Sequence, residues 1–467
     1  MSRQSGLNFS PSKDTVVLGE TPGDIVLSRT SSFSEEALDE KQEFNHDNNF
    51  PDGGRQAWTT VGGAFLGLTS VFGVLNSVGA IEAHIRDNQL REVPTSTVSW
   101  IFSIYTFMLF FSGIFCGCFF DRNGCSYINH IGSAFSIVGL YTLAVSTKVW
   151  HFILSFSICY GLGSGILLTS LISAASTWFR KKSNTAQGLI SLGGSFGGIV
   201  FPVMLRKLYS EIGYANAIRV LASILSLFLI LSCILTKENS KVVDYVKDRS
   251  RKETKKEILK VYVTDLINLK YLLEPKFFFC TLGCACAESG TTVAATYFAS
   301  YCIHKGYTAA QSYTFITVIN AFGILGRSSG WLADRYTGRY HILFATMLLA
   351  SIFCFVLWLP FGNHMKVMYA YCALYGCMVS GFLSLAPAAV GAISKIEEFG
   401  KRFSTMYFVV SVFCIPILEI GGVIIGDSKS QSSFNHYVIF CSCILLLGAI
   451  SYTITRILHL GLKAGKF

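Results

Sequence analysis

Charged residues are scarce in this sequence of 467 residues, because Asp, Glu, Lys and Arg together make up only 14%. Soluble domains carry about 25%, so a water-soluble globular protein is excluded. The sequence also lacks a glycine-rich phosphate loop after a strand, a Walker sequence and a catalytic triad. We therefore expect no enzyme activity, no cofactor and no ATP-driven pumping. Instead, 51% of the residues are apolar and the mean hydropathy is +0.49.

Cysteine, by contrast, is not scarce, with 15 residues. Most of them fall inside apolar stretches, where cysteine behaves as a small hydrophobic residue. Only Cys280, Cys284 and Cys286 have a spacing that resembles metal ligands, and no histidine or second cysteine pair accompanies them. We expect these three to pack rather than to bind a metal.

Twelve apolar stretches are long enough to cross the roughly 30 Å of hydrocarbon in a bilayer. Between the fifth and sixth stretches, Arg206, Lys207, Glu211 and Arg219 are expected in a turn. The expected spans are 58–81, 98–120, 126–147, 149–176, 184–204, 218–236, 277–300, 312–333, 340–361, 366–392, 403–426 and 436–459.

Lysine and arginine are distributed unevenly over the segments that join these spans. Of the 38, 28 fall on the side of the N-terminus and 9 on the opposite side, and Arg327 lies within a span. Positive residues favour the cytoplasmic side, so both termini are expected in the cytoplasm. This bias also explains the net charge of +10, which is therefore no argument for nucleic-acid binding.

The polar segments divide the chain into five parts. Residues 51–236 and 277–460 are expected to form two six-helix bundles, joined by the charged cytoplasmic linker 237–276. Within the linker, residues 258–267 are amphipathic and predict a helix on the membrane surface. Residues 461–467 form a short cytoplasmic tail.

The N-terminal segment 1–50 has nine acidic and four basic residues, which predicts a disordered cytoplasmic tail without a cleavable signal. It offers kinase sites within residues 29–36 and ubiquitin-ligase sites at Lys13 and Lys41. An inert solvated tail is the alternative.

A short polar turn closes two of the even-numbered spans, and each time a glycine precedes the aspartate by four residues. A carboxylate at a helix end can cap the N-terminus of a neighbouring helix. Such a contact must break when that side of the protein opens, so the two turns are predicted to act in gating. The predicted gating residues are Asp121, Arg122, Asp334 and Arg335.

Two further motifs flank the first and fifth spans. Asp52, Gly53 and Gly54 make a tight turn before the first span, and Trp58 is expected at the membrane interface. After the fourth span, a basic run is expected to anchor the inner leaflet, and the glycines at 193–198 should let the fifth helix pack closely against a neighbour. The motif residues in this second region are Phe179, Arg180, Lys181 and Gly188.

The paired Asp-Arg turns resemble the signature of the major facilitator superfamily. With the other two motifs they resemble its monocarboxylate-transporter family, and the fungal members in particular, from about residue 51 to 460. The resemblance implies an all-α membrane protein with 12 transmembrane helices in two pseudo-repeated six-helix bundles. Residues 51–54, 88–90 and 205–211 look closest to the branch that facilitates riboflavin uptake.

The sequence departs from the animal members of that family at two positions. Those members hold a lysine in helix 1, where this chain has Asn76, and an aspartate in helix 8, where it has Gly323. The helix 8 arginine is retained as Arg327. The resemblance therefore implies that two of the three charges of the animal proton–lactate mechanism are missing.

Polar residues inside spans are the candidates for solute binding, because they usually face a cavity or a partner. Arg327 could bind an anionic solute or pair with a carboxylate, and Glu288 could be that partner or a proton carrier. Asn76 and Asn320 could bond a solute or a neighbouring helix. His84 is expected as a solvated group at the outer mouth.

We predict a multi-pass secondary transporter that moves a small organic solute by alternating access. The preferred interpretation is a facilitator of riboflavin-like solutes in the plasma membrane rather than the vacuolar membrane. One alternative is a proton-coupled monocarboxylate symporter that binds its anion at Arg327. The second is a non-transporting nutrient sensor, against which the short cytoplasmic segments argue.

Overall fold

Every regular element of the described chain is a helix. The predicted tail 1–50 and the amphipathic stretch 258–267 lie outside the described residues. The computed structural model describes residues 51–240, 269–395, 398–426 and 430–461.

The first bundle occupies each of the first six predicted spans, several of them with two or three consecutive helices. Its elements are α2 (Arg55–Leu75), α3 (Val78–Asp87), α4 (Thr95–Phe111), α5 (Gly113–Asn123), α6 (Ser126–Leu143), α7 (Val149–Phe152), the π-helix η2 (Ile153–Tyr160), α8 (Gly161–Ser176) and α9 (Ser183–Leu235).

The second bundle occupies the other six predicted spans. Its elements are η3 (Leu269–Leu273), α12 (Pro275–His304), α13 (Ala309–Arg327), α14 (Ser329–Leu332), η4 (Ala333–Thr337), α15 (Arg339–Phe353), η5 (Cys354–Trp358), α16 (Leu359–Phe361), α17 (Met365–Ala392), α18 (Phe399–Ile425) and α19 (Gln431–Leu460).

Nine helical stretches of the described chain are long and apolar enough to cross a membrane. One of them, α9, supplies two crossings, because its backbone leaves the helical region at Gly213 (φ 76°, ψ 170°). The chain reverses there, so the residues that flank α9 come together. The Trp178 indole, before α9, donates to the Lys237 carbonyl, after it, at 2.7 Å. Glycine suits this position because it adopts positive φ without a steric penalty.

The predicted turn between spans five and six is therefore shorter than expected. Arg206, Lys207 and Glu211 belong to the first half of α9, and Arg219 belongs to its second half. Lys207 and Glu211 form an i,i+4 ion pair at 3.8 Å with both side chains exposed, which is compatible with continued helix. The prediction was wrong here because charge was taken as a sign of a turn, whereas Gly213 alone breaks the helix.

Large apolar side chains cover the outer surface of the helices. On the second half of α9, Leu227, Ile230 and Ile234 are each more than half exposed and lie on one helix face. A water-soluble protein would not present such a stripe, whereas lipid tails solvate it without cost.

Within the first bundle, α2 and α9 pack backbone to backbone through the predicted glycine series. A methyl group on Gly193 would overlap the Phe65 carbonyl, and one on Gly197 would overlap the Cα of Gly73. The predicted close approach of the fifth helix to a neighbour is confirmed, and the neighbour is the first helix.

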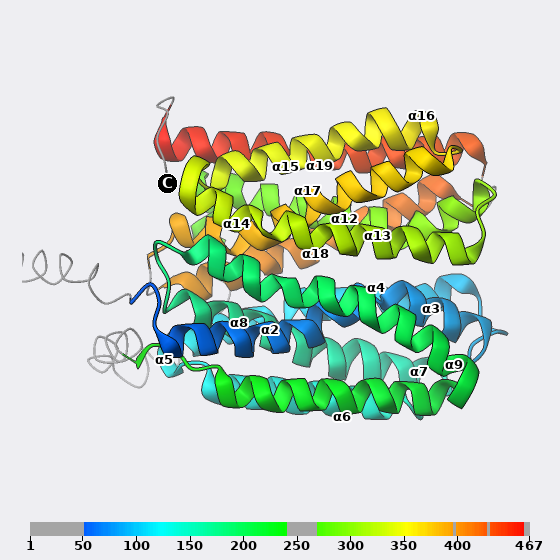
Figure 1. Ribbon diagram of the computed structural model, residues 1–467, viewed down its shortest axis with the longest axis horizontal. Coiled ribbons are helices and arrows are strands. Elements are labelled where there is room, and N and C mark those ends of the chain that lie inside the picture. Colours follow the sequence, from blue (N-terminus) through cyan, green and yellow to red (C-terminus); the bar gives the residue numbers. More distant parts are fainter. Residues whose placement is uncertain (1–50, 241–268, 396–397, 427–429, 462–467) are drawn as a thin grey trace, which may run out of the picture. The chain divides into compact units, whose positions relative to one another are not determined.

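In Figure 1 the helices of both bundles run roughly along one axis. We call the end that carries Asp121 and Asp334 the closed end, because the two bundles are joined there. The opposite end, which carries α3 and the start of α13, is called the open end (Figure 1).

Candidate functional site

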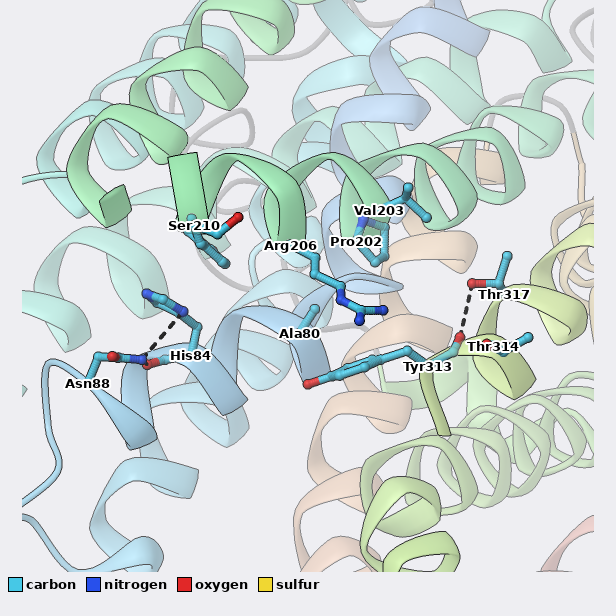
Figure 2. A pocket seen from close by; sticks show the side chains of 11 residues that line it. Ala80, His84, Asn88, Pro202, Val203, Arg206, Ser210, Tyr313, Thr314 and Thr317 are labelled. Atoms are coloured by element: carbon cyan, nitrogen blue, oxygen red, sulfur yellow. Dashed lines mark hydrogen bonds between the residues drawn. The ribbon is translucent and has the colours of Figure 1, made fainter. Parts of the chain in front are cut away.

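A cavity of about 600 Å³ lies between the two bundles at the open end. Its walls come from α3 and α9 of the first bundle and from α13 of the second, as Figure 2 shows. Ligand pockets usually measure about 300–1,000 Å³, so the cavity has the size of a small-molecule site. The lining residues are Ala80, His84, Asn88, Pro202, Val203, Arg206, Tyr209, Ser210, Tyr313, Thr314 and Thr317.

One turn deeper, the end of α2 and the helix α13 both approach α9 at Gly198. A Cβ on Gly198 would lie 2.6 Å from the Asn320 side-chain oxygen and 2.9 Å from the Asn76 Cβ. Asn76 and Asn320 are one turn from the lining residues Ala80 and Thr317. The structure therefore brings these two predicted residues together below the cavity, with α9 between them.

Each asparagine keeps part of its hydrogen-bonding capacity for a solute. The Asn76 amide donates to the Gly194 carbonyl on α9 at 3.0 Å, and the Asn320 amide donates to Ile316 on its own helix at 3.1 Å. Both residues are only partly buried. Each side chain also has a carbonyl oxygen that can accept a hydrogen bond.

Arg327 does not line this cavity. It is 3% exposed and reaches from α13 into α9, where it donates to the Ser195 hydroxyl at 2.8 Å and to the Ser191 carbonyl. Gly188 makes room for this contact, because a Cβ there would lie 2.6 Å from the Arg327 carbonyl. In this conformation Arg327 joins the two bundles, and binding of a solute by Arg327 stays a prediction.

Glu288 and Arg327 interact electrostatically without forming a close ion pair. Glu288 is 4% exposed on α12 and accepts a hydrogen bond from the Tyr407 hydroxyl of α18 at 3.4 Å. Among the described residues, no ion pair within 4.0 Å joins Glu288 to Arg327. The predicted structural pairing of the two charges is therefore not formed in this conformation.

The position of the missing helix 8 aspartate is closely packed. A Cβ on Gly323 would overlap the Ser380 hydroxyl on α17 and would lie 3.2 Å from the Ser195 hydroxyl on α9. A larger side chain at this position would have to displace the Ser380 hydroxyl. Of the two departures noted in the sequence, Asn76 thus lies at the cavity floor and Gly323 in a close helix contact, while the Arg327 guanidinium lies beside Gly194.

At the closed end, Asp121 on α5 caps the N-terminus of α18 in the other bundle. Its two carboxylate oxygens accept from the Gly400 and Lys401 amides, each at 3.1 Å. Asp121 is 8% exposed. The residue that would normally cap α18, Glu398, makes no side-chain cap, so the first bundle supplies it.

Asp334 makes the matching contact from the second bundle to the first. It accepts from the Thr185 amide at 2.8 Å, from the Thr185 hydroxyl at 2.6 Å and from the Asn184 side chain at 2.6 Å. These donors belong to the first turn of α9, whose own cap residue Lys182 makes no cap either. We call the contacts of Asp121 and Asp334 the interbundle caps.

The glycines that precede the two aspartates also occupy equivalent places. A Cβ on Gly117 would overlap the Gly400 carbonyl, and one on Gly330 would overlap the Asn184 carbonyl. Each repeated turn therefore places its glycine and its aspartate against the same opposing helix end. Arg335 stacks over Trp331 and Tyr336, at 5.5 and 5.4 Å. The side chain of Arg122 lies outside what the structure describes.

The two motifs that flank the first and fifth spans contact each other. One oxygen of Asp52 accepts from the amides of Arg180 and Lys181 at 2.7 Å and of Lys182 at 3.3 Å. Positive φ at Gly53 and Gly54 turns the chain so that the Trp58 ring lies 5.0 Å from the Phe179 ring. The basic run thus holds a carboxylate through its backbone, a partnership that was not predicted.

Two further groups of residues were missed in the sequence. Arg402 at the start of α18 binds both carboxylate oxygens of Glu274 at 2.8 Å and lies 4.6 Å above the Tyr271 ring. At the open end, the His84 ring stacks on Tyr209 at 3.8 Å, so His84 is not the freely solvated group that was expected. Neither pair has a local sequence signal, because the partners are far apart in the chain.

Comparison with known proteins agrees with this architecture. The family model described as Major Facilitator Superfamily matches residues 56–415. The riboflavin transporter MCH5 of Saccharomyces cerevisiae is 41% identical over 454 residues, which cover 95% of this chain and 85% of that protein. An MFS-type transporter of Gibberella moniliformis is 31% identical over 411 residues, which cover 87% and 92%.

Among solved structures, the proton:xylose symporter XylE bound to 6-bromo-6-deoxy-D-glucose superposes with a TM-score of 0.66. The match covers 87% of this chain and 96% of that one at 10% identity, which is a likeness of fold alone. The predicted all-α fold of two six-helix bundles is confirmed.

Proposed function

Because this chain belongs to the Major Facilitator Superfamily, we propose that it facilitates the passage of a riboflavin-like solute without proton coupling. The chain is a membrane transporter, and the identity of its solute is the proposal. The observation that carries it is the floor of the cavity, where Asn76 stands at the position of the helix 1 lysine and lies with Asn320 beside Gly198. The relative named as a riboflavin transporter supports the same solute class.

We further propose that the closed end faces the cytoplasm, with both termini there, and that the protein resides in the plasma membrane rather than the vacuolar membrane. In this orientation the cavity is open to the outside, and solute release requires the interbundle caps to break. Kinases or ubiquitin ligases acting on residues 1–50 would then reach the tail from the cytoplasm.

Uptake of labelled riboflavin in cells that lack their own carrier tests the proposal. We expect uptake that survives a protonophore and falls at least about tenfold in Asn76→Lys, equivalent to about 1.4 kcal/mol. The physical reason is that an ammonium group beside Gly194 and Asn320 places an unpaired charge in the solute path. Asn216→Lys, the same change at an exposed position of α9, should transport normally.

A proton-coupled monocarboxylate symporter is the second candidate. The buried carboxylate of Glu288, which accepts a long hydrogen bond from Tyr407, supports it because such a group can exchange a proton. Lactate uptake that collapses with the protonophore and in Glu288→Gln would favour this candidate. Absence of riboflavin uptake despite normal surface expression would contradict the first.

A further inference from the structure

We infer that the walls of the open-end cavity form an aromatic recognition site for a planar heteroaromatic ring, separate from the asparagine floor. The inference rests on the proposed function, because it assigns a binding place to one part of a flavin-type solute. The site consists of His84 and Tyr209 on one wall, Tyr313 on the other, and Arg206 between them.

One wall is a stack of three nearly parallel rings. The His84 and Tyr209 rings lie 3.8 Å apart at 17°, and the Tyr214 ring lies 5.8 Å from His84 at 6° and 6.0 Å from Tyr209 at 22°. The stack joins α3 to both halves of α9, so it is held in place from three helix segments. A preformed aromatic wall favours flat ligands because little side-chain freedom is lost on binding.

The opposite wall comes from the other bundle. In Figure 2 the Tyr313 side chain extends from α13 across the cavity toward α3, and the Arg206 guanidinium points into the space from α9. A planar ring bound here would contact both bundles at once. The site is therefore complete only in the conformation that holds α13 opposite α3 and α9 at the open end.

Tyr209 carries a hydroxyl that lacks a partner. Its hydroxyl is buried and makes no hydrogen bond within the described part of the chain. Because this oxygen is buried, Tyr209 contributes to the site through its ring rather than through its hydroxyl. Among the described lining residues Arg206 carries the one fixed charge, and its planar group can donate to two carbonyl oxygens.

These features match an isoalloxazine-type ring, which is flat and carries carbonyl acceptors along one edge. Small aliphatic carboxylates would leave the aromatic wall unused. The floor lies one turn deeper, so the hydroxylated chain of a flavin-type solute would reach the amides of Asn76 and Asn320 while the ring stays between the tyrosines. The two parts of the solute are thus recognised at two depths.

The experiment measures binding and uptake with the purified full-length protein in lipid nanodiscs and with the same variants in cells. Stacking on tyrosine quenches flavin fluorescence, so riboflavin and lumiflavin, which is the ring without the hydroxylated chain, are titrated against the protein. The variants are Tyr209→Ala, Tyr209→Phe and Arg206→Gln. The controls are Lys207→Gln, one residue away on an exposed and paired side chain, and the exposed Tyr127→Phe.

We expect wild-type protein to quench both flavins, and Tyr209→Ala and Arg206→Gln to weaken binding of both at least tenfold. The KM of riboflavin uptake should rise in parallel while the maximal rate stays within twofold, and Tyr209→Phe, which keeps the ring, should bind both flavins like the wild type. Loss of quenching in Tyr209→Ala and Arg206→Gln supports the inference even where riboflavin is not transported. Absence of transport would overturn the proposed function alone. Absence of quenching in the wild type, or unchanged binding in both variants despite normal expression, overturns the inference.

Discussion

Asn76, Gly323 and Arg327 stand at the three positions where the animal relatives carry charges. In this structure the first lies at the cavity floor, the second lies in a close helix contact, and the third is bound to α9. Of these three positions, only Arg327 therefore carries a charge in this chain, and its guanidinium is bound to α9.

Gly323 gives a direct test of this packing. Gly323→Ala should destabilise this conformation by about 1–3 kcal/mol, because the added methyl group overlaps the Ser380 hydroxyl. Thermal unfolding of the purified protein checks it. Gly79→Ala, at a glycine with no atom within 4 Å of an added Cβ, is the matched control. A double variant with Ser380→Ala should regain part of the loss, and equal melting temperatures for Gly323→Ala and Gly79→Ala would contradict the packing argument.

The helix ends of α9 and α18 depend on residues outside their own bundles. Lys182 and Glu398 occupy their cap positions without capping them, and Asp334 and Asp121 supply the missing acceptors from across the interface. Helix N-termini attract carboxylates through their free amides and their dipole. A few charge-assisted hydrogen bonds therefore help to hold the two bundles together at the closed end. The bonds to each aspartate can break and re-form together.

Hydrogen exchange measured by mass spectrometry can follow each cap separately. Asp121→Asn should speed amide exchange at the start of α18 several-fold, consistent with about 1 kcal/mol for a cap, and leave the start of α9 unchanged. Asp334→Asn should do the reverse, so each variant is the control for the other. Equal acceleration at both helix ends in both variants would indicate global opening instead of separate caps.

The two bundles together form a closed end and a cavity at the other end, which is the arrangement expected for one state of an alternating-access carrier. A facilitator in this class moves solute in both directions. Preloading cells with unlabelled riboflavin should therefore accelerate entry of labelled riboflavin about two- to tenfold when return of the empty carrier limits the rate. The comparison is with unloaded cells and with cells expressing Asn76→Lys, and a flux that ignores the internal solute would contradict a carrier mechanism.

The helices could be predicted from apolar length, and the repeated turns correctly marked two places where helices approach closely. The partners of those turns could not be predicted, because Gly400 and Thr185 carry no signal that links them to Asp121 and Asp334. Residue type identified Arg327 and Glu288 as buried charges. Their contacts with α9 and α18 could not be predicted, because they depend on how the helices pack. His84 was misjudged for the same reason, since its stacking partner Tyr209 belongs to a distant helix.

The interbundle caps also bear on biosynthesis. Each half of the chain lends an aspartate to the other, so a nascent polypeptide that ends before α18 exposes Asp121 without the amides that satisfy it. The first half can insert into the bilayer during translation, but its face at the closed end is complete only after Gly400 and Lys401 have been made. Truncated products would thus display an unsatisfied polar surface by which cellular quality control can distinguish them from finished molecules.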